Sequence, residues 1–460
     1  MTRTTRRQFM QATAGVALTP YFLSSAQPAV AQAPSDRIRM GAIGFGGMGR
    51  ADASIFSNLC DVVALCDVDS QRLDAAANDR SIGRRNPDKV KDYRKILERN
   101  DIDAITIGTP DHWHVKIAIE ALQSGKHVYC QKPLTLTVEE GRLIRDACKK
   151  YNKLALQVGT QQRSEEGLHF LNAHILIRKG LLGDVKKILC DIGGSPSSPR
   201  PIPVAPVPEP LDWDMWLGQA PKTDYLSLTE TRNDGSSRTF TRCHGVFRYW
   251  YEYSGGTMTD WGAHHVDCAM WAIGQDGPGQ GPVKFKPIVA EHPVPFEKGY
   301  PTVANQYNTS PRFDIECTFE SGTVMNIVSR SEFGNGILFE GTKGRIHVSR
   351  GHINGAPVEA IRDKWNEWIT EEDYVKAFNG MKREGHRQNL MTCIRQGGLP
   401  ISDVFSHVQA MNVCHLAAIS ARLNREVLYD PKTETTGDAE SQTFLSRERR
   451  KEYDIPNVGV

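Results

Sequence analysis

The spacing of apolar and polar positions changes along this chain and divides it into two parts. From residue 38 to about residue 159, short β-prone apolar runs alternate with stretches of helical periodicity. The strand runs lie at residues 38–43, 61–67, 104–107, 127–130 and 154–159, and the helical stretches include residues 115–122 and one that begins with a capping box at 137–140. This alternation predicts a parallel sheet wrapped by helices.

Beyond about residue 185 the pattern favours antiparallel strands. Every second residue is apolar over 313–319, a Ser-Gly turn follows, and residues 323–328 return as the partner strand. A second hairpin is predicted around the turn at 341–344. Near the end of the chain, apolar positions mark one face of a helix and predict core packing; they are Val404, Val408, Met411, His415 and Ile419.

Two segments do not follow either pattern. Residues 195–210 hold seven prolines in sixteen positions, which favours an ordered surface excursion over a flexible linker. Residues 5–10 read Thr-Arg-Arg-Gln-Phe-Met, an apolar stretch too short to span a bilayer follows, and Ala29-Val30-Ala31 supplies a cleavage site. Residues 1–31 are therefore predicted to be a twin-arginine export signal, which leaves a periplasmic or otherwise extracytoplasmic protein without a membrane anchor.

Composition and charge narrow the class of protein. The chain has 460 residues, 39% of them hydrophobic, which suffices for a sizeable core in more than one domain. Lys plus Arg number 56 against 54 for Asp plus Glu, so no electrostatic field favours nucleic acid. The ten cysteines contain no C-x-x-C pair, so neither a disulfide framework nor a structural zinc site is predicted.

The first strand and helix enclose a glycine turn typical of dinucleotide binding. Gly44-Phe45-Gly46-Gly47-Met48-Gly49 matches G-x-G-x-x-G between a strand and a helix. Gly44 permits the tight turn, Gly46 lets the backbone approach a pyrophosphate, and Gly49 allows close packing of helix and strand. Asp67 ends the second strand, where a carboxylate accepts the ribose hydroxyls and repels a 2′-phosphate. This pattern predicts bound NAD rather than NADP.

Further polar residues follow later strands of the same sheet. Thr109-Pro110 comes after the strand at 104–107 with Asp111-His112-Trp113-His114 directly behind, and Gln131-Lys132-Pro133 comes after the strand at 127–130. Ligands bind outside the carboxyl ends of parallel strands, so these residues are expected at the cofactor site.

The chemistry is predicted near residue 260. Helical spacing would place Asp260, His264 and Asp267 on one face, where a carboxylate could raise the basicity of an imidazole that removes an alcohol proton. The ammonium of Lys132 could bind the alcohol oxygen. Five residues are candidate substrate contacts, namely Trp113, Trp261, His265, Arg163 and Asp267. For Trp113, Trp261 and His265 the alternative is core packing, and for Arg163 it is capping of the first domain. No metal site is predicted.

These motifs, in this order, resemble the Gfo/Idh/MocA oxidoreductase family. The resemblance rests on four motifs. They are the glycine turn, Thr109-Pro110 with His114, Gly125-Lys126-His127-Val128 leading into Gln131-Lys132-Pro133, and Gly255-Gly256 leading into Asp260-x-Gly262-x-His264. The resemblance implies a Rossmann domain at residues 37–160 and an α/β domain at 161–455, with a large open sheet that often serves oligomerisation as a dimer or tetramer. It implies that Lys132, Asp260 and His264 are catalytic. The family's Glu-Lys-Pro is Gln131-Lys132-Pro133 here, so a carboxylate partner of Lys132 is missing.

Together these observations predict an exported NAD-dependent oxidoreductase that acts on a secondary alcohol or carbonyl of a sugar or cyclic polyol. Because no nicotinamide pool exists outside the cytoplasm, the cofactor should be held tightly and restored within each cycle. Two alternatives stay open. One is a redox-neutral glycosidase, in which transient oxidation permits elimination of the aglycone, and the other is a cofactor-binding protein without turnover.

Overall fold

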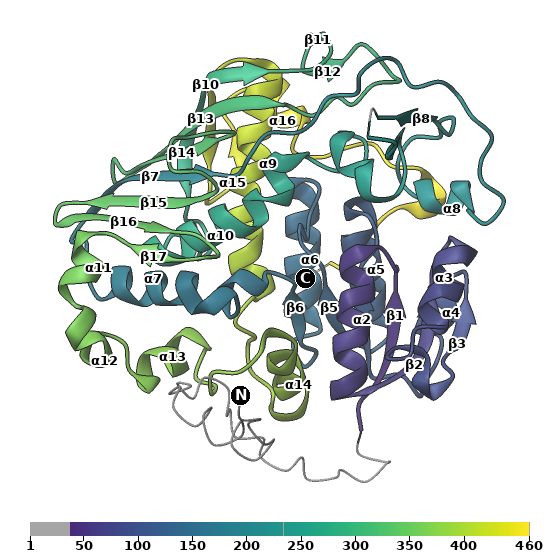
Figure 1. The fold of residues 1–460 in the computed structure, drawn as a ribbon, viewed down its shortest axis with the longest axis horizontal. Helices are drawn as coiled ribbons and strands as arrows, with labels where there is room; N and C mark the ends of the chain where they lie inside the picture. The colour runs from purple at the N-terminus through teal and green to yellow at the C-terminus, as the bar shows by residue number, and fades with distance from the viewer. Residues whose placement is uncertain (1–36, 233, 460) are drawn as a thin grey trace, which may run out of the picture. The chain divides into compact units, whose positions relative to one another are not determined.

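The structure is a computed structural model that describes residues 37–232 and 234–459. The predicted export signal at residues 1–31 lies outside the described residues. Residues 38–459 form one compact unit built on two large sheets (Figure 1). None of the described helices is long and apolar enough to cross a membrane.

The first sheet has six parallel strands in the order β3-β2-β1-β4-β5-β6, the order of a doubly wound dinucleotide-binding sheet. The strands are β1 (Arg39–Ile43), β2 (Asp61–Cys66), β3 (Asp88–Val90), β4 (Ala104–Ile107), β5 (His127–Cys130) and β6 (Leu156–Val158). The helices that wrap it are α2 (Gly47–Leu59), α3 (Ser70–Ala77), α4 (Arg94–Leu97), α5 (His114–Gln123) and α6 (Val138–Lys150). The predicted parallel sheet is confirmed.

The second sheet has nine strands, in the order β17-β16-β15-β7-β14-β13-β10-β18-β19. The strands are β7 (Val185–Asp191), β10 (Pro282–Glu291), β13 (Arg312–Phe319), β14 (Val324–Val328), β15 (Gly336–Gly341), β16 (Gly344–Val348), β17 (Ile353–Asn354), β18 (Val427–Asp430) and β19 (Thr435–Thr436). Among these described strands only β7 and β14 pair in parallel, so the sheet is mainly antiparallel as predicted. The alternation in β13 buries its apolar side chains.

Three helices lie against the second sheet, namely α7 (His169–Arg178), α10 (Gly262–Ile273) and α15 (Val404–Leu423) (Figure 1). The long helix α15 packs against β10 and β13 on one side and against α6 and β6 on the other. The residues before it extend the first sheet, because Val158 donates its N–H to the carbonyl of Ser402 at 3.0 Å. The α15 helix therefore contributes side chains to the separate cores of both sheets.

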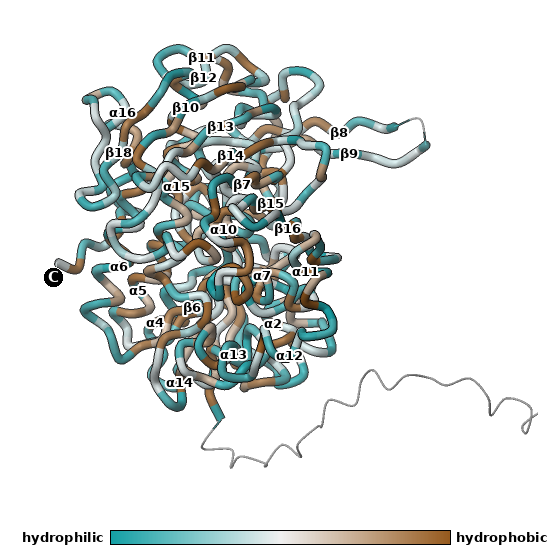
Figure 2. The backbone as a smooth tube through the Cα atoms, turned by 90° about the vertical axis from the view of Figure 1, so that its left-hand side faces the viewer, coloured by the Kyte–Doolittle hydropathy of each residue, from teal (hydrophilic) through white to brown (hydrophobic). Residues whose placement is uncertain are grey.

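The proline-rich segment is ordered against the body of the protein, as predicted. Ile202 is fully buried and donates its N–H to the carbonyl of Asn305, and Ala205 donates its N–H to the carbonyl of Tyr225. Beyond it, β8 (Ser227–Thr231) and β9 (Ser237–Thr241) form a hairpin that projects from the body and is mostly hydrophilic (Figure 2). After β9 the chain turns back through a 3₁₀ helix, His244–Tyr249.

Two local predictions are confirmed only in part. Thr137 caps α6 through the N–H of Glu140, but the Glu140 carboxylate accepts from Leu136 instead of Thr137, so the capping box is only half formed. The helical run predicted from Asp260 is broken at Trp261 into α9 (Thr257–Asp260) and α10. Trp261 keeps right-handed helical backbone angles, φ −87° and ψ −29°, so the run is divided there and then continues to Ile273 as predicted.

Candidate functional site

The glycine turn has the geometry predicted from its sequence. Gly44 has φ +85°, and a Cβ there would lie 2.7 Å from the backbone of Gly108. A Cβ on Gly49 would lie 2.0 Å from the carbonyl oxygen of Gly44, so helix and strand could not approach as they do. Gly46 is the N-cap of α2, and a Cβ on it would meet only Arg72, at 3.7 Å. The turn thus leaves the N-terminus of α2 bare for an anion.

Asp67 holds this turn to the end of β2. Its carboxylate accepts the N–H of Phe45 at 2.7 Å and that of Asp69 at 2.9 Å. Burial raises the pKa of Asp67, and these backbone hydrogen bonds act against that rise. An ionised carboxylate has about four acceptor positions, so capacity for ribose hydroxyls is left over.

A cleft runs from the glycine turn to Lys132 and contains about 1160 Å³ of empty space, part of it open to solvent. One wall consists of the turn and the carboxyl edge of the first sheet, and includes all the predicted cofactor residues, Met48 and Pro110 among them. The opposite wall comes from the second part of the chain and consists of Met215, Trp216, His244, Gly245, Phe247 and Arg248.

The two walls are tied together beside the turn. Asp69 pairs with Leu211 as an isolated β-bridge, and Ser70 donates its N–H to the carbonyl of Pro210 at 2.9 Å. His244 Nε2 lies 3.4 Å from Asp69 Oδ2. The second part of the chain therefore closes over the nucleotide end of the cleft.

At the other end of the cleft, Asp260 binds two cations. Lys132 Nζ lies 2.5 Å from Asp260 Oδ1, and Arg248 Nε lies 3.1 Å from the same oxygen. Burial alone would raise the pKa of Asp260, but the charges of Lys132 and Arg248 hold it well below its usual range. Asp260 therefore stays ionised and supplies the carboxylate partner that Lys132 lacks at residue 131.

His264 is not paired with Asp260, contrary to prediction. The imidazole is buried, and its Nδ1 has no hydrogen-bond partner among the described residues. Burial, together with the charges of Lys132 and Arg350, holds its pKa well below the usual value. His264 is therefore a neutral imidazole whose basicity is lowered by burial and by the two cations, although the charge of Asp260 acts against this.

Gln131 has a partner that explains its place in the motif. Its Nε2 donates to Asp52 Oδ2 at 2.6 Å, and Asp52 Oδ1 accepts from Arg387 Nη2 at 2.7 Å. Both Gln131 and Asp52 are buried. A glutamate at residue 131 would place two carboxylates in contact, whereas the amide of glutamine donates to the one that is present. The departure from Glu-Lys-Pro therefore follows from Asp52, which lies on α2.

The remaining predicted cofactor residue is His114. Its Nδ1 lies 2.7 Å from the carbonyl oxygen of Pro133 and its Nε2 lies 3.0 Å from that of Thr109. The ring lines the cleft and fixes the loops after β4 and β5 to each other. Direct contact between His114 and a cofactor stays a prediction.

The predicted substrate contacts separate into two groups. Trp113 lines the cleft and Trp261 contacts the rings of His264 and His265 edge-on. His265 is fully buried with both ring nitrogens hydrogen-bonded, to Gln162 and Asn335, so it faces the interior of the protein.

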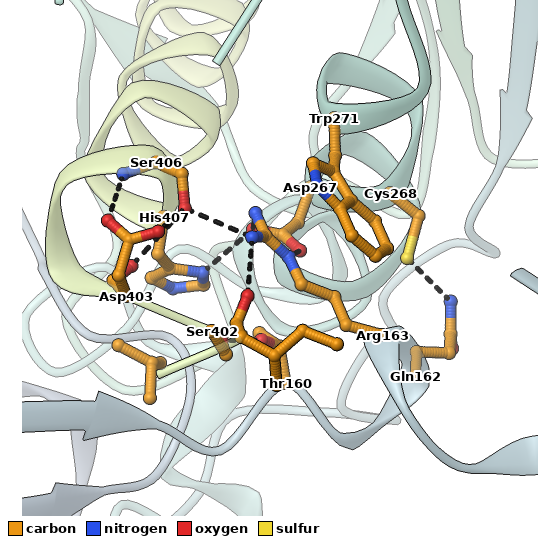
Figure 3. A network of polar contacts seen from close by, with 12 residues as sticks. Thr160, Gln162, Arg163, Asp267, Cys268, Trp271, Ser402, Asp403, Ser406 and His407 are labelled. Atoms are coloured by element: carbon orange, nitrogen blue, oxygen red, sulfur yellow. Dashed lines mark hydrogen bonds and ion pairs between the residues drawn. The ribbon is translucent and has the colours of Figure 1, made fainter. Parts of the chain in front are cut away.

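Arg163 and Asp267 lie in a buried polar network away from the cleft (Figure 3). Two hydrogen bonds of 2.6 and 2.8 Å join them, and His407 Nδ1 lies 3.1 Å from Asp267. Arg163 also donates to the carbonyl of Ile401 and to Ser406, just before and on α15. This pair joins the end of the first sheet to α10 and α15 and does not face the substrate side of the cleft.

Several site residues carry no signal that sequence reasoning could use. Arg248, Asp52 and Arg350 are single charged residues outside any motif, brought to the site by tertiary packing. Asp111 follows Pro110 directly and lines the cleft beside Lys132. Its position after a strand is the signal by which the sequence predicted it at this edge of the sheet.

The residues of the cleft fit a nicotinamide dinucleotide. The bare backbone of the turn and the N-terminus of α2 suit a pyrophosphate. Thr109 Oγ1 and Gln131 Oε1 lie at the cleft wall without hydrogen-bond partners among the described residues. Such groups are costly unless a ligand or a small movement satisfies them.

Comparison with known proteins agrees with this geometry. Residues 38–160 match a family described as oxidoreductase family, NAD-binding Rossmann fold, and residues 197–455 match its companion, the C-terminal alpha/beta domain. Among solved structures, the fold is similar to the WlbA dehydrogenase from Bordetella pertussis in complex with NADH and UDP-GlcNAcA. That similarity has a TM-score of 0.58 at 18% identity and covers 85% of this chain and 97% of the other.

Curated relatives are similar over a shorter stretch. A glycosyl hydrolase family 109 protein from Shewanella baltica is 31% identical, and an alpha-N-acetylgalactosaminidase from Shewanella oneidensis is 30% identical, each over 205 residues. These residues are 39% of this chain and 44% of each relative, so the similarity spans less than half of either protein.

Proposed function

Since the chain belongs to the Gfo/Idh/MocA oxidoreductase family and its first part is an NAD-binding Rossmann domain, we propose that it transfers a hydride between tightly held NAD and a secondary alcohol or carbonyl of a sugar or cyclic polyol. The observation that carries this proposal is the cleft, which connects the glycine turn to the Lys132–Asp260–Arg248 cluster. NAD, when bound, would supply the hydride acceptor and donor.

In this proposal separate parts fall to Lys132 and Trp113, which line the cleft, and to His264 and Trp261, which lie beyond its lining residues. The Lys132 ammonium, oriented by Asp260, binds the substrate oxygen and stabilises negative charge that develops on it. His264, as a neutral imidazole, accepts a hydrogen bond from the hydroxyl and helps to orient it. Trp113 and Trp261 offer indole faces for the C–H face of a sugar ring.

A second candidate is a redox-neutral glycosidase, favoured by the two Shewanella relatives. Transient oxidation of a ring hydroxyl acidifies the adjacent C–H. A base removes that proton, the aglycone leaves, and addition of water with reduction closes the cycle. The same cleft and cluster would serve this chemistry. A third candidate, a cofactor-binding protein without turnover, would hold NAD in the cleft and change no sugar.

One experiment separates the three candidates. Purified protein that retains its nucleotide is incubated with free sugars, cyclic polyols and chromogenic glycosides, and products are identified by mass. Oxidised and reduced sugar products support the oxidoreductase, and aglycone release with no net redox change supports the glycosidase. Bound NAD with no product in any incubation would leave only the binding protein.

We further propose that the protein is exported by the twin-arginine machinery and assembles as a homo-oligomer, a dimer or tetramer. The residues that support export are Arg6, Arg7 and the cleavage site after Ala31. Replacing both arginines by lysine should keep the protein in the cytoplasm, and light scattering of the mature protein measures its assembly. Unchanged export of the double variant would refute the twin-arginine route.

A further inference from the structure

Asp111 is a buried carboxyl of the cleft that the reaction described above does not use. It is 2% exposed, lies just beyond the end of β4 and lines the cleft with Lys132. β4 and β5 are neighbours in register, with Ile107 opposite Cys130, so Asp111 and Lys132 leave the same edge of the sheet. The carboxyl thus lies where ligands bind in such folds.

The hydrogen bonding of Asp111 is unlike that of a structural carboxylate. Ser254 Oγ donates to Asp111 Oδ2 at 2.5 Å, and Oδ1 accepts no hydrogen bond from the described residues. Asp111 begins the short 3₁₀ helix, Asp111–Trp113, that precedes α5. Within the described ranges no backbone N–H donates to its carboxyl, so the carboxyl does not cap this helix. Buried polar atoms are normally hydrogen-bonded, so a buried carboxyl with one oxygen that accepts no hydrogen bond indicates a role other than stabilising the fold.

Other acidic or basic groups near Lys132 are unsuited to receive a proton. Asp260 is bound by two cations, which hold its pKa well below the usual range. His264 resists protonation because burial and the charges of Lys132 and Arg350 lower its pKa. Oxidation of an alcohol nevertheless releases a proton that must go to some group.

We propose that Asp111 is the proton-transferring carboxyl of this site, which takes up the hydroxyl proton of the substrate and returns it in the reverse reaction. This inference rests on the proposed hydride transfer. In the oxidising direction the O–H bond breaks and its proton passes to the Asp111 carboxylate. The C–H bond breaks with its electron pair leaving to the nicotinamide oxidant, and the product is the carbonyl.

The electrostatic surroundings of Asp111 suit a carboxyl that transfers a proton. Burial raises the pKa of Asp111 to about 7, and the charge of Arg248 and the hydrogen bond from Ser254 act against the rise. The titratable or charged groups that face it or line the cleft beside it are Lys132, Cys130, Arg248, Asp260 and His114. A carboxyl that titrates near neutrality can both accept and release a proton at working pH.

The test compares wild type, Asp111→Asn and Ser254→Ala, each loaded with NAD, with D-glucose, myo-inositol and p-nitrophenyl N-acetyl-α-galactosaminide as probes. In the wild type, kcat/KM for oxidation should rise with pH through a midpoint near 7, since the carboxylate form is required. Asp111→Asn should lower turnover by about a hundredfold and abolish the rise of kcat/KM with pH, while the affinity for NAD stays unchanged. Ser254→Ala should move the midpoint to higher pH, because the hydroxyl that lowers the pKa is gone.

Full activity and an unchanged rise of kcat/KM with pH in Asp111→Asn would overturn the inference. Infrared difference spectra recorded below and above neutral pH give a readout that needs no substrate. A protonated carboxyl band that titrates in the wild type and disappears in Asp111→Asn is expected. If no probe reacts with the wild type, the proposed function fails. The infrared band then decides whether Asp111 is the titrating group. If the band is still present in Asp111→Asn, that assignment is refuted.

Discussion

At the scale of single residues, a charged side chain determines how its neighbours in the site are hydrogen-bonded. Asp260 accepts from Lys132 and Arg248 on one oxygen, so it fixes the Lys132 ammonium and is not available to His264. Asp52 accepts from Gln131 and Arg387, so residue 131 must donate a hydrogen bond. In both cases the charge of one residue determines the hydrogen-bonding role of its neighbour.

Removing the Lys132 or His264 side chain should abolish catalysis while leaving the cofactor bound. Lys132→Met and His264→Ala are each expected to lower turnover by at least about a hundredfold, because each group acts on the substrate oxygen. Steady-state kinetics and nucleotide content measure the two effects separately. His352→Ala, which changes an exposed histidine, serves as the control. Near-normal activity in His264→Ala would falsify its assignment to the reacting site.

Placing a carboxylate at residue 131 should weaken both the fold and the site. In Gln131→Glu the new carboxylate meets Asp52, so the pair shares a proton and one folded-state pKa is raised. The stability of this variant should be highest in acid and fall as pH rises through that raised pKa. Thermal unfolding at several pH values and NAD titration measure it.

The matched control for this change is the exchanged pair, Asp52→Asn with Gln131→Glu. It keeps one carboxylate and one amide in contact, and the new amide at residue 52 can still accept from Arg387 through its carbonyl oxygen. The double variant should recover most of the NAD affinity. No recovery would mean that the hydrogen bond between residues 52 and 131 is unimportant for the site.

At the scale of elements, short connections position the chemistry. α9 ends at Asp260, which binds Lys132, and α10 begins two residues later and carries Asp267, which binds Arg163. The glycine turn, β2 and α3 form the nucleotide end, and Asp67 fastens the turn through the N–H of Phe45. The 3₁₀ helix after β9 brings Arg248 to the opposite wall.

Asp67 should determine the preference for NAD over NADP. Its half-buried carboxylate would repel a 2′-phosphate, and Arg72 lies close to the glycine turn. Asp67→Ser is expected to raise the NADP-to-NAD affinity ratio by about tenfold, which corresponds to about 1.4 kcal/mol. Calorimetric titration with both nucleotides measures the ratio, and Asp74→Ser, an exposed carboxylate on α3, is the control. An unchanged ratio in Asp67→Ser would contradict the assignment.

At the scale of the whole molecule, a helix and a buried ion pair join the two sheets. The α15 helix packs against both, and the Arg163–Asp267 pair links the end of the first sheet to α10 and α15 (Figure 3). His264 lies one helical turn before Asp267 on α10. The position of the imidazole relative to the cleft therefore depends on a buried ion pair outside it.

Breaking this pair should destabilise the whole fold. Asp267→Asn leaves the Arg163 charge buried without a counterion and should lower the free energy of unfolding by about 3–5 kcal/mol. Burial would raise the pKa of Asp267, but Arg163 and His407 hold it below its usual value. Its contribution is therefore present above the unfolded-state pKa and is lost as pH falls through the folded-state pKa, so the defect should shrink in acid.

Urea unfolding at neutral and acid pH measures this defect. Asp184→Asn, which breaks an exposed pair with Lys186, is the control and should change stability by less than about 1 kcal/mol. A similar small effect in Asp267→Asn would show that the buried pair does not join the two sheets.

The sequence by itself determined the parallel sheet, the glycine turn and the antiparallel strands of the second sheet. These depend on local periodicity and on the backbone freedom of Gly44, which are properties of neighbouring residues. It also predicted the family and the positions of Lys132, Asp260 and His264. The pairing of these residues was decided only in the tertiary structure. Asp260 lies 128 residues from Lys132, and Arg387 lies 335 residues from Asp52. Hydrogen bonds and charge act through space, so the state of His264 and the reason for Gln131 became visible only after folding had brought distant segments together.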